Sequence, residues 1–137
     1  MTAPDVLYAA AVAALKTIGS TKVTVYEADV PDRPPALTDG RVLPYVVVWP
    51  GPGATATDQA VTGPSGLDWS VQVTVAAGDV TWCLQACTLV RGVLHGKVLV
   101  TGTGPLVDDT PRGLTVTRDP ALPDRWFAPL IFACLNP

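Results

Sequence analysis

The stretch Trp69-Ser-Val-Gln-Val-Thr-Val75 decides the fold of this chain. Its tryptophan and three valines alternate with serine, glutamine and threonine, so one side of the segment is apolar and the other is polar. A period of two residues is that of a β-strand, in which successive side chains point to opposite faces. The sequence therefore predicts a strand with one face in the core.

A helix is predicted directly after this strand. Ala76-Ala-Gly78 allows a turn, and Asp79 can accept hydrogen bonds from the free N–H groups of a first helical turn. The helix is expected to end before Gly96, because glycine readily takes the left-handed conformation found at helix C-termini. Apolar residues recur between these limits at steps of three and four, which predicts one buried stripe: Cys83, Ala86, Cys87, Val90, Val93 and Leu94.

The N-terminal part of the chain adds a helix and two strands. Thr2-Ala-Pro-Asp5 has the form of a capping box, and an alanine-rich apolar stripe follows it as far as Gly19. Alternation from Lys22 to Glu27 predicts a strand. The continuous apolar run Tyr45-Val-Val-Val-Trp49 predicts a strand that is buried on both faces.

Two long irregular stretches separate these strands. Residues Ala28 to Pro44 contain four prolines and three aspartates, a composition that opposes regular pairing, and Pro50 to Gly66 is rich in Gly, Pro and Thr. Loops of about 15 residues in a small domain are more often functional or disordered than idle. We therefore expect both stretches to supply contact surfaces.

Three further strands are predicted in the C-terminal third. Val98-Leu-Val100 forms a short one, Leu114 to Arg118 alternates, and Trp126 to Leu135 forms a long final strand. Pro129 in that final strand has no N–H to donate to a ladder, which predicts an edge position or a bulge. An exposed edge at the end of the chain invites pairing with another subunit.

Together these elements predict one α+β domain spanning residues 1–137. Its single mixed, mainly antiparallel β-sheet is packed by two main helices, at about 3–19 and 79–95, and carries long Pro- and Gly-rich loops. Charged residues make up 15% of the chain, against about 25% in a typical soluble domain. Either the surface is neutral and rich in Pro, Ala and Thr, or other subunits cover part of it.

Charge and hydropathy argue against several classes of function. The net charge of −3 and the scattered basic residues argue against a surface that binds nucleic-acid phosphates. The apolar run from Val6 to Leu15 follows an aspartate and is far shorter than the ~20 residues that span a bilayer. Neither a signal peptide nor a membrane anchor is therefore expected. Three cysteines without regular spacing fit a reducing compartment.

No motif predicts a reaction, a cofactor or a metal site. On one helix, Cys83 and His95 would lie about 18 Å apart at ~1.5 Å per residue, too far to bind one zinc ion. A catalytic pair of Cys134 with His95 is compatible with the spacing but has no visible orienting residue. Asp108 and Asp109 are interpreted as a solvated turn rather than paired catalytic carboxylates. The glycine-rich segments also fail both signatures of nucleotide binding.

Four segments, taken in order, resemble the tail terminator, or tail completion, proteins of long-tailed non-contractile bacteriophages, particularly those of actinobacterial hosts. They are patterns of packing and turns that cover nearly the whole chain. The segments are the opening helix; Val25-Tyr26 followed by Leu43-Pro-Tyr-Val-Val-Val-Trp-Pro50; Trp69 to Val75 with the helix ending Val90-Arg-Gly-Val-Leu-His-Gly96; and Arg118-Asp-Pro120 before Asp124-Arg-Trp-Phe-Ala-Pro-Leu130.

The resemblance implies a subunit of a hexameric ring at the head-proximal end of the tail. Such a ring stops growth of the tube built from the major tail-tube protein and joins the head-completion, or stopper, protein. Genome DNA would pass through its lumen without sequence-specific binding. The implied protein is structural, with no enzymatic activity, cofactor or membrane, and it lies at the tail–neck junction of the virion after assembly in the host cytoplasm.

Two alternatives stay open from the sequence. Within the virion, the chain could be a head-completion stopper or another neck component. Outside it, a small enzyme or ligand-binding module would use Cys134 and His95. Under the ring hypothesis, the candidate interface residues are Asp32, Arg33, Asp39, Arg41, Thr55, Asp58, Gln59, Asp108, Asp109, Arg112 and Trp126.

Overall fold

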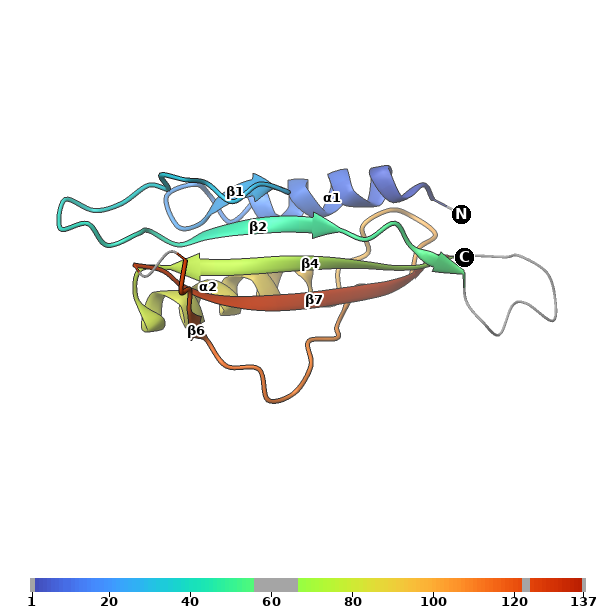
Figure 1. The fold of residues 1–137 in the computed structure, drawn as a ribbon. Coiled ribbons are helices and arrows are strands. Elements are labelled where there is room, and N and C mark those ends of the chain that lie inside the picture. The colour runs from blue at the N-terminus through green and yellow to red at the C-terminus, as the bar shows by residue number, and fades with distance from the viewer. Residues whose placement is uncertain (1, 56–66, 122–123, 137) are drawn as a thin grey trace.

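A computed structural model describes residues 2–55, 67–121 and 124–136 of the chain (Figure 1). Within these residues the chain forms two helices and seven strands. In order, they are α1 (Pro4–Lys16), β1 (Thr24–Glu27), β2 (Tyr45–Pro50), β3 (Ala54–Thr55), β4 (Leu67–Ala77), α2 (Val80–Leu94), β5 (Val107–Asp108), β6 (Thr117–Arg118) and β7 (Trp126–Asn136).

The strands form one sheet in the order β1-β2-β4-β7-β5, and the short strands β3 and β6 pair with β4 and β7. β1 is parallel to β2, whereas all other pairings are antiparallel. The two eleven-residue strands β4 and β7 pair along their whole length. The predicted α+β fold with a mixed, mainly antiparallel sheet is therefore confirmed.

The main core lies between the sheet and the two helices, which cover one of its faces (Figure 1). The apolar side chains of the deciding stretch are at most 1% exposed, as their alternation predicts. Opposite them in β7 lie further buried residues. Facing pairs are Trp69 with Cys134, Val71 with Phe132, Val73 with Leu130, and Val75 with Ala128.

Strand β2 is buried on both faces, as predicted from its continuous apolar run. Val46 and Val48 belong to the main core under the helices. Tyr45 and Val47 point the other way and form a smaller cluster with Val42 and partly buried neighbours on the face without helices. This second cluster is where the long loop before β2 meets the sheet.

Helix α2 begins and ends as the sequence predicts. The Oδ1 atom of Asp79 accepts hydrogen bonds from the N–H groups of Thr81 (2.8 Å) and Trp82 (3.4 Å). The last helical residue is Leu94. Gly96 follows with a φ of 81°, a conformation that costs a side-chain-bearing residue free energy.

The capping box predicted for α1 is wrong. Its N-cap is Ala3, which makes no side-chain cap hydrogen bond, and Pro4 begins the helix. Proline is tolerated there because an N–H group in the first turn has no helical partner in any case. The helix also ends earlier than predicted, at Lys16, and a tighter turn continues to Gly19. Neither helix of the described chain has the length and hydropathy needed to cross a membrane.

The strand predicted at Val98–Val100 is also wrong. Gly96 donates its N–H to the carbonyl of Leu106 (2.7 Å), and Leu106 donates to the carbonyl of Lys97 (2.8 Å). These bonds close a loop immediately after α2, and the apolar residues within it pack partly against the core. Leu99 and Val100 therefore pack against the core without joining a strand.

The outer edge of β7 is covered by other parts of the chain. β5 and β6 pair near its two ends. Between them, Ile131 donates its N–H to Oγ1 of Thr110 (3.0 Å) and accepts a hydrogen bond from Asp109 N–H (2.8 Å). Backbone groups on one side of a strand recur at every second residue, so the nitrogen of Pro129 faces the same way as that of Ile131, away from β4. The missing N–H group of Pro129 therefore removes no hydrogen bond between β7 and β4. Pro129 thus lies at a position of β7 that neither β5 nor β6 pairs, but β7 is an inner strand of the sheet, so the predicted exposed terminal edge is wrong.

Candidate assembly interface

Residues 28–44, here called the arm, project past one end of the sheet (Figure 1). Ala36 and Val42 form a bridge, and Leu37 donates its N–H to the carbonyl of Arg41 (2.9 Å). Gly40, with a φ of 89°, closes this short hairpin. The arm forms no strand, as the prolines predict, and this single bridge is its one β-type pairing among the described residues.

The base of the arm is held by Arg125, which is 3% exposed and lies just before β7. Its Nη1 donates to the carbonyl of Pro31 (2.8 Å) and to the hydroxyl of Tyr45 (3.1 Å), and its Nη2 donates to the carbonyl of Asp32 (2.9 Å). Burial raises the pKa of Tyr45, although the Arg125 hydrogen bond opposes that rise. One guanidinium thus joins the arm, β2 and the final strand.

The tip of the arm is held against the start of α2. The guanidinium carbon of Arg41 lies 4.7 Å from the ring centre of Trp82, a cation–π distance. Its Nε is 2.9 Å from Oδ2 of Asp39, and hydrogen bonds from Arg41 lower the pKa of this carboxyl. Leu37 nevertheless stays 40% exposed. The tip therefore has a defined shape and an accessible apolar side chain.

Gly78 allows the arm to approach the turn between β4 and α2. Its N–H donates to the carbonyl of Val42 (2.8 Å). A Cβ atom at this position would lie 2.5 Å from the backbone nitrogen of Val42, closer than real Cβ contacts. The short distance involves backbone, so a side-chain rotation cannot relieve it.

We expect Gly78→Ala to lower the free energy of unfolding by about 1–3 kcal/mol, because the arm must shift away from the turn. Urea denaturation measures this loss. Gly92→Ala is the matched control, since a Cβ there meets nothing within 4 Å and alanine favours a helix interior by roughly 1 kcal/mol. Equal stability of the two variants would contradict the close approach.

The opposite edge of the sheet carries a second polar cluster. Arg91 of α2 lies with its Nε 2.7 Å from Oδ2 of Asp108, and Oδ1 of the same carboxylate accepts from Thr110 N–H (3.0 Å). The N–H of Asp108 donates to Nδ1 of His95 (3.2 Å). Burial raises the pKa of Asp108, but hydrogen bonds from Thr110 and Arg91 outweigh this effect and lower it. Asp108 is therefore not the solvated turn residue predicted.

We expect Asp108→Asn to cost about 1 kcal/mol of stability at neutral pH, since Arg91 is half exposed and water screens the pair. The folded-state pKa is lowered, so the stabilisation is present above the unfolded pKa of ~3.9 and is lost as pH falls through the folded pKa. Urea denaturation from pH 7 to pH 3 should show the two proteins converging in acid. Asp109→Asn, at an exposed neighbour, is the control; a difference independent of pH would contradict the ion pair.

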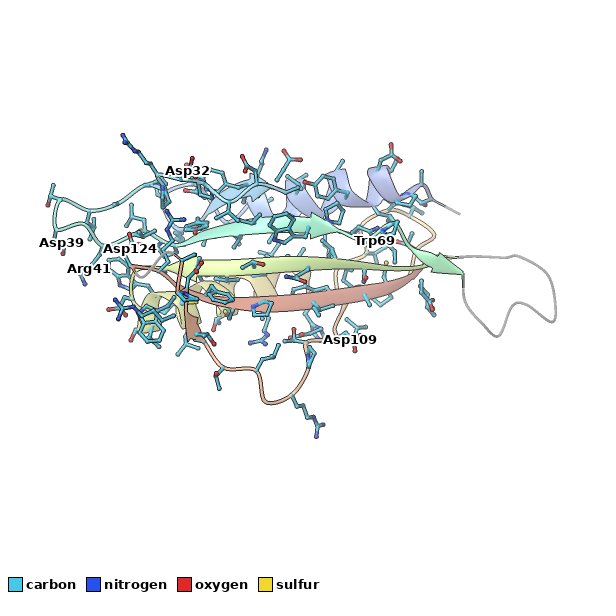
Figure 2. The ribbon with its side chains drawn as sticks, viewed as in Figure 1. Asp32, Asp39, Arg41, Trp69, Asp109 and Asp124 are labelled. Carbon is cyan, nitrogen blue, oxygen red and sulfur yellow. The ribbon has the colours of Figure 1, made fainter. Side chains whose placement is uncertain are left out.

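The structure divides most of the predicted interface residues into two groups. Asp32, Arg33, Asp39 and Arg41 lie on the arm, whereas Asp108, Asp109 and Arg112 lie in β5 and the loop that follows it. Figure 2 shows Asp32 and Asp109 at opposite edges of the sheet. A single copy therefore cannot bring these two groups together.

The remaining predicted residues fall elsewhere. Trp126 is partly buried at the start of β7, and Thr55 ends the short strand β3. Asp58 and Gln59 lie outside the described residues. Trp126 directly follows Arg125, whose guanidinium binds the Asp32 carbonyl of the arm, and it pairs with Arg118 of β6.

Sequence reasoning missed Arg125, Trp82 and Gly78 as the residues that hold the arm. A basic residue directly before a long apolar strand was the available signal for Arg125. Buried arginine requires hydrogen-bond partners, and here they come from residues 80 to 94 positions away. Sequence spacing does not indicate such distant partners.

All three cysteines are buried. Cys83 lies 3.6 Å from the carbonyl of Val75, and burial raises the pKa of Cys134. His95 instead contacts Asp108, and no hydrogen bond joins it to Cys134 in the described chain. Among the described residues, no group of three or more His, Cys, Asp or Glu side chains could hold a metal ion.

Helix α2 has few charges on its outer side. Arg91 is the one charged residue among its fifteen, while Leu84 is 52% and Leu89 36% exposed. Between α2 and the end of the arm lies a groove of about 560 Å³, lined mainly by apolar side chains that include Pro44 and Trp82. Two exposed leucines and a single charge on a surface helix favour the interpretation that other subunits cover part of it.

Comparison with known proteins adds a likeness in structure. No protein-family model and no curated protein matches the chain. One solved chain, from the "Virion of native gene transfer agent (GTA) particle", is similar in structure, with a TM-score of 0.53 and 23% sequence identity. The alignment covers 89% of this chain and 83% of that one. At this identity the likeness shows a shared fold.

Proposed function

We propose that this protein is a structural subunit of a phage-type virion, and specifically the tail terminator. The observation that carries the proposal is the fold likeness to a virion subunit, which spans 89% of the chain. The order of segments that resembles tail terminator proteins runs over the same length. Two independent comparisons, of sequence pattern and of fold, thus point to the same class of particle.

The arm fits the task of capping a tube. It is held at its base by three Arg125 hydrogen bonds and at its tip by Arg41 over Trp82. A contact element that is already ordered loses less conformational entropy on binding than a flexible loop. One face of a closed ring would bind the last ring of the tail-tube protein, and the other would bind the head-completion protein.

The single charge of α2, its exposed leucines and the low overall charge fit a subunit with several neighbours. We propose no catalytic role. The His95 and Cys134 side chains that an enzyme would use have other partners, namely the Asp108 N–H group and the β4–β7 core. DNA would pass through the lumen without specific contacts, in keeping with the net charge of −3.

Deletion of the gene tests the proposal. We expect tails of unregulated length, or heads without joined tails, when particles are viewed by electron microscopy. Particles of normal length and composition would overturn it. Locating the labelled protein relative to the portal distinguishes a terminator, at the tail side of the neck, from a head-completion stopper next to the portal.

Native mass spectrometry of the purified chain, alone and with tail-tube protein, tests the ring. A single species of several 14.3 kDa subunits is expected. A persistent monomer under both conditions would count against a ring-forming role.

A further inference from the structure

The two edges of the sheet differ in whether other parts of the chain cover them. The β7 edge is covered by β5, β6 and Thr110, with Pro129 at the position between them. The opposite edge is β1, a four-residue strand that pairs only with β2 among the described strands. In Figure 1, β1 and the loop after β5 lie on opposite sides of the sheet.

The free backbone groups of β1 can be identified from its hydrogen bonds. Thr24 and Ala28 donate their N–H groups to carbonyls of Pro44 and Val48, next to and within β2. Since the period is two, the backbone groups of Val25 and Glu27 face away from β2. No backbone hydrogen bond from the described residues reaches them on that side. Uncovered strand edges are sites of pairing with another chain.

Charged side chains extend this edge into the arm. Asp29, Asp32 and Arg33 are exposed there. The Asp32 side chain is free of the arm's anchor, because only its carbonyl binds Arg125. Burial raises the pKa of Tyr8, and the nearby carboxylate of Glu27 raises it further, so Glu27 lies close to α1.

The loop after β5, beside the β7 edge, carries charged side chains that can complement those of the β1 edge. Asp109 and Arg112 are exposed in the loop after β5, and Leu114 is 51% exposed. Residues 114–116 have no strand partner although they alternate in the sequence like a strand. Thr117 pairs with Phe127 of β7, so by the period of two the backbone groups of Val116 face outward.

We propose that neighbouring copies join head to tail through these two edges. The β1 edge and residues 29–33 of one copy receive residues 109–116 of the next, with Arg112 beside Asp32 and Asp109 beside Arg33. This inference rests on the proposed ring and names the surfaces that close it. A contact between two different edges of the same subunit is heterologous, and repeated heterologous contacts form a ring when the rotation between neighbours closes and an open filament when it does not.

A charge swap within one chain tests the pairing. Asp32→Arg alone and Arg112→Asp alone each bring like charges together, and each should weaken association by about tenfold or more. The double variant restores opposite charges and should regain assembly near that of the unmodified chain. Asp5→Arg and Lys16→Asp, both exposed on α1, are the matched controls and should assemble normally. Sedimentation velocity measures assembly, and circular dichroism checks the fold.

Disulfide capture gives a second measure that depends on distance. The three natural thiols are buried, so cysteines placed at Asp32 and Arg112 would be the accessible ones. A disulfide needs Cα atoms roughly 4.4–6.8 Å apart, so capture reports direct contact between the arm of one copy and the loop after β5 of the next. Mild oxidation of the double-cysteine variant should give covalent multiples of 14.3 kDa, whereas a pair at Asp5 and Arg112 should not.

The outcomes separate this inference from the proposed function. An unmodified chain that forms rings, together with single reversals that assemble normally and no cross-linking, would overturn the edge contact and leave the terminator role intact. A double charge variant as dissociated as the single ones would also overturn it. An unmodified chain that stays monomeric with and without tail-tube protein would overturn both.

Discussion

Replacing Arg125 with methionine is expected to lower the free energy of unfolding by about 2–4 kcal/mol. The side chain is 3% exposed, and its loss leaves two arm carbonyls and the Tyr45 hydroxyl without their donor. Methionine fills similar space but donates no hydrogen bond. Urea denaturation measures the loss, and hydrogen exchange at Leu37 and Leu43 reports whether the arm loosens.

Two further variants make this result specific. Arg125→Lys keeps the charge, but one ammonium cannot reproduce the planar fork that serves three acceptors, so an intermediate loss is expected. Arg33→Met removes an exposed arginine of the arm and should change stability by less than about 0.5 kcal/mol. If Arg125→Met were as stable as the unmodified chain with the same exchange rates, the guanidinium would not be the anchor of the arm.

Replacing Trp69 with alanine is expected to cost about 3–5 kcal/mol, the largest effect of any single change considered. Trp69 is 0% exposed and lies between the helices and the β4–β7 pair. Its Nε1 also donates a hydrogen bond to the carbonyl of Gly51 (3.0 Å). Both the cavity and the unpaired carbonyl lower the stability, and urea denaturation or heating measures the sum.

Trp69→Phe separates the two contributions. Phenylalanine keeps most of the packing but cannot donate to Gly51, so a loss of about 1–2 kcal/mol is expected. Trp49→Ala is the comparison at a partly exposed position of β2 and should cost less than Trp69→Ala. Equal losses at Trp49 and Trp69 would mean that burial does not decide the contribution of these side chains.

The elements closest to the deciding stretch were predictable. Alternation gave β4 and its buried face, and the three- and four-residue steps gave α2 with its stripe. Asp79 and Gly96 marked the helix ends because capping depends on residues within one turn. These signals are local, so neighbouring residues carry all the information that they need.

The candidate site was predictable only in part. Its charged residues could be chosen from the loops, but their division between two edges depends on strand order. Arg125, which orders the arm, was not predicted at all. The strand predicted at Val98–Val100 is absent because hydrogen bonds of Leu106 with Gly96 and Lys97 close a loop there. Asp108 is not a solvated turn residue because Arg91 pairs with it.

The sequence by itself determined the strand at Trp69–Val75, the helix after it, the class of the fold and the low charge of the surface. Only the tertiary structure decided that the β7 edge is covered, that β1 is open and that the arm is ordered. Periodicity reports which side of an element is apolar, and that property is local. Covered edges and buried arginine partners depend on residues up to 94 positions apart, which meet only after the sheet has formed.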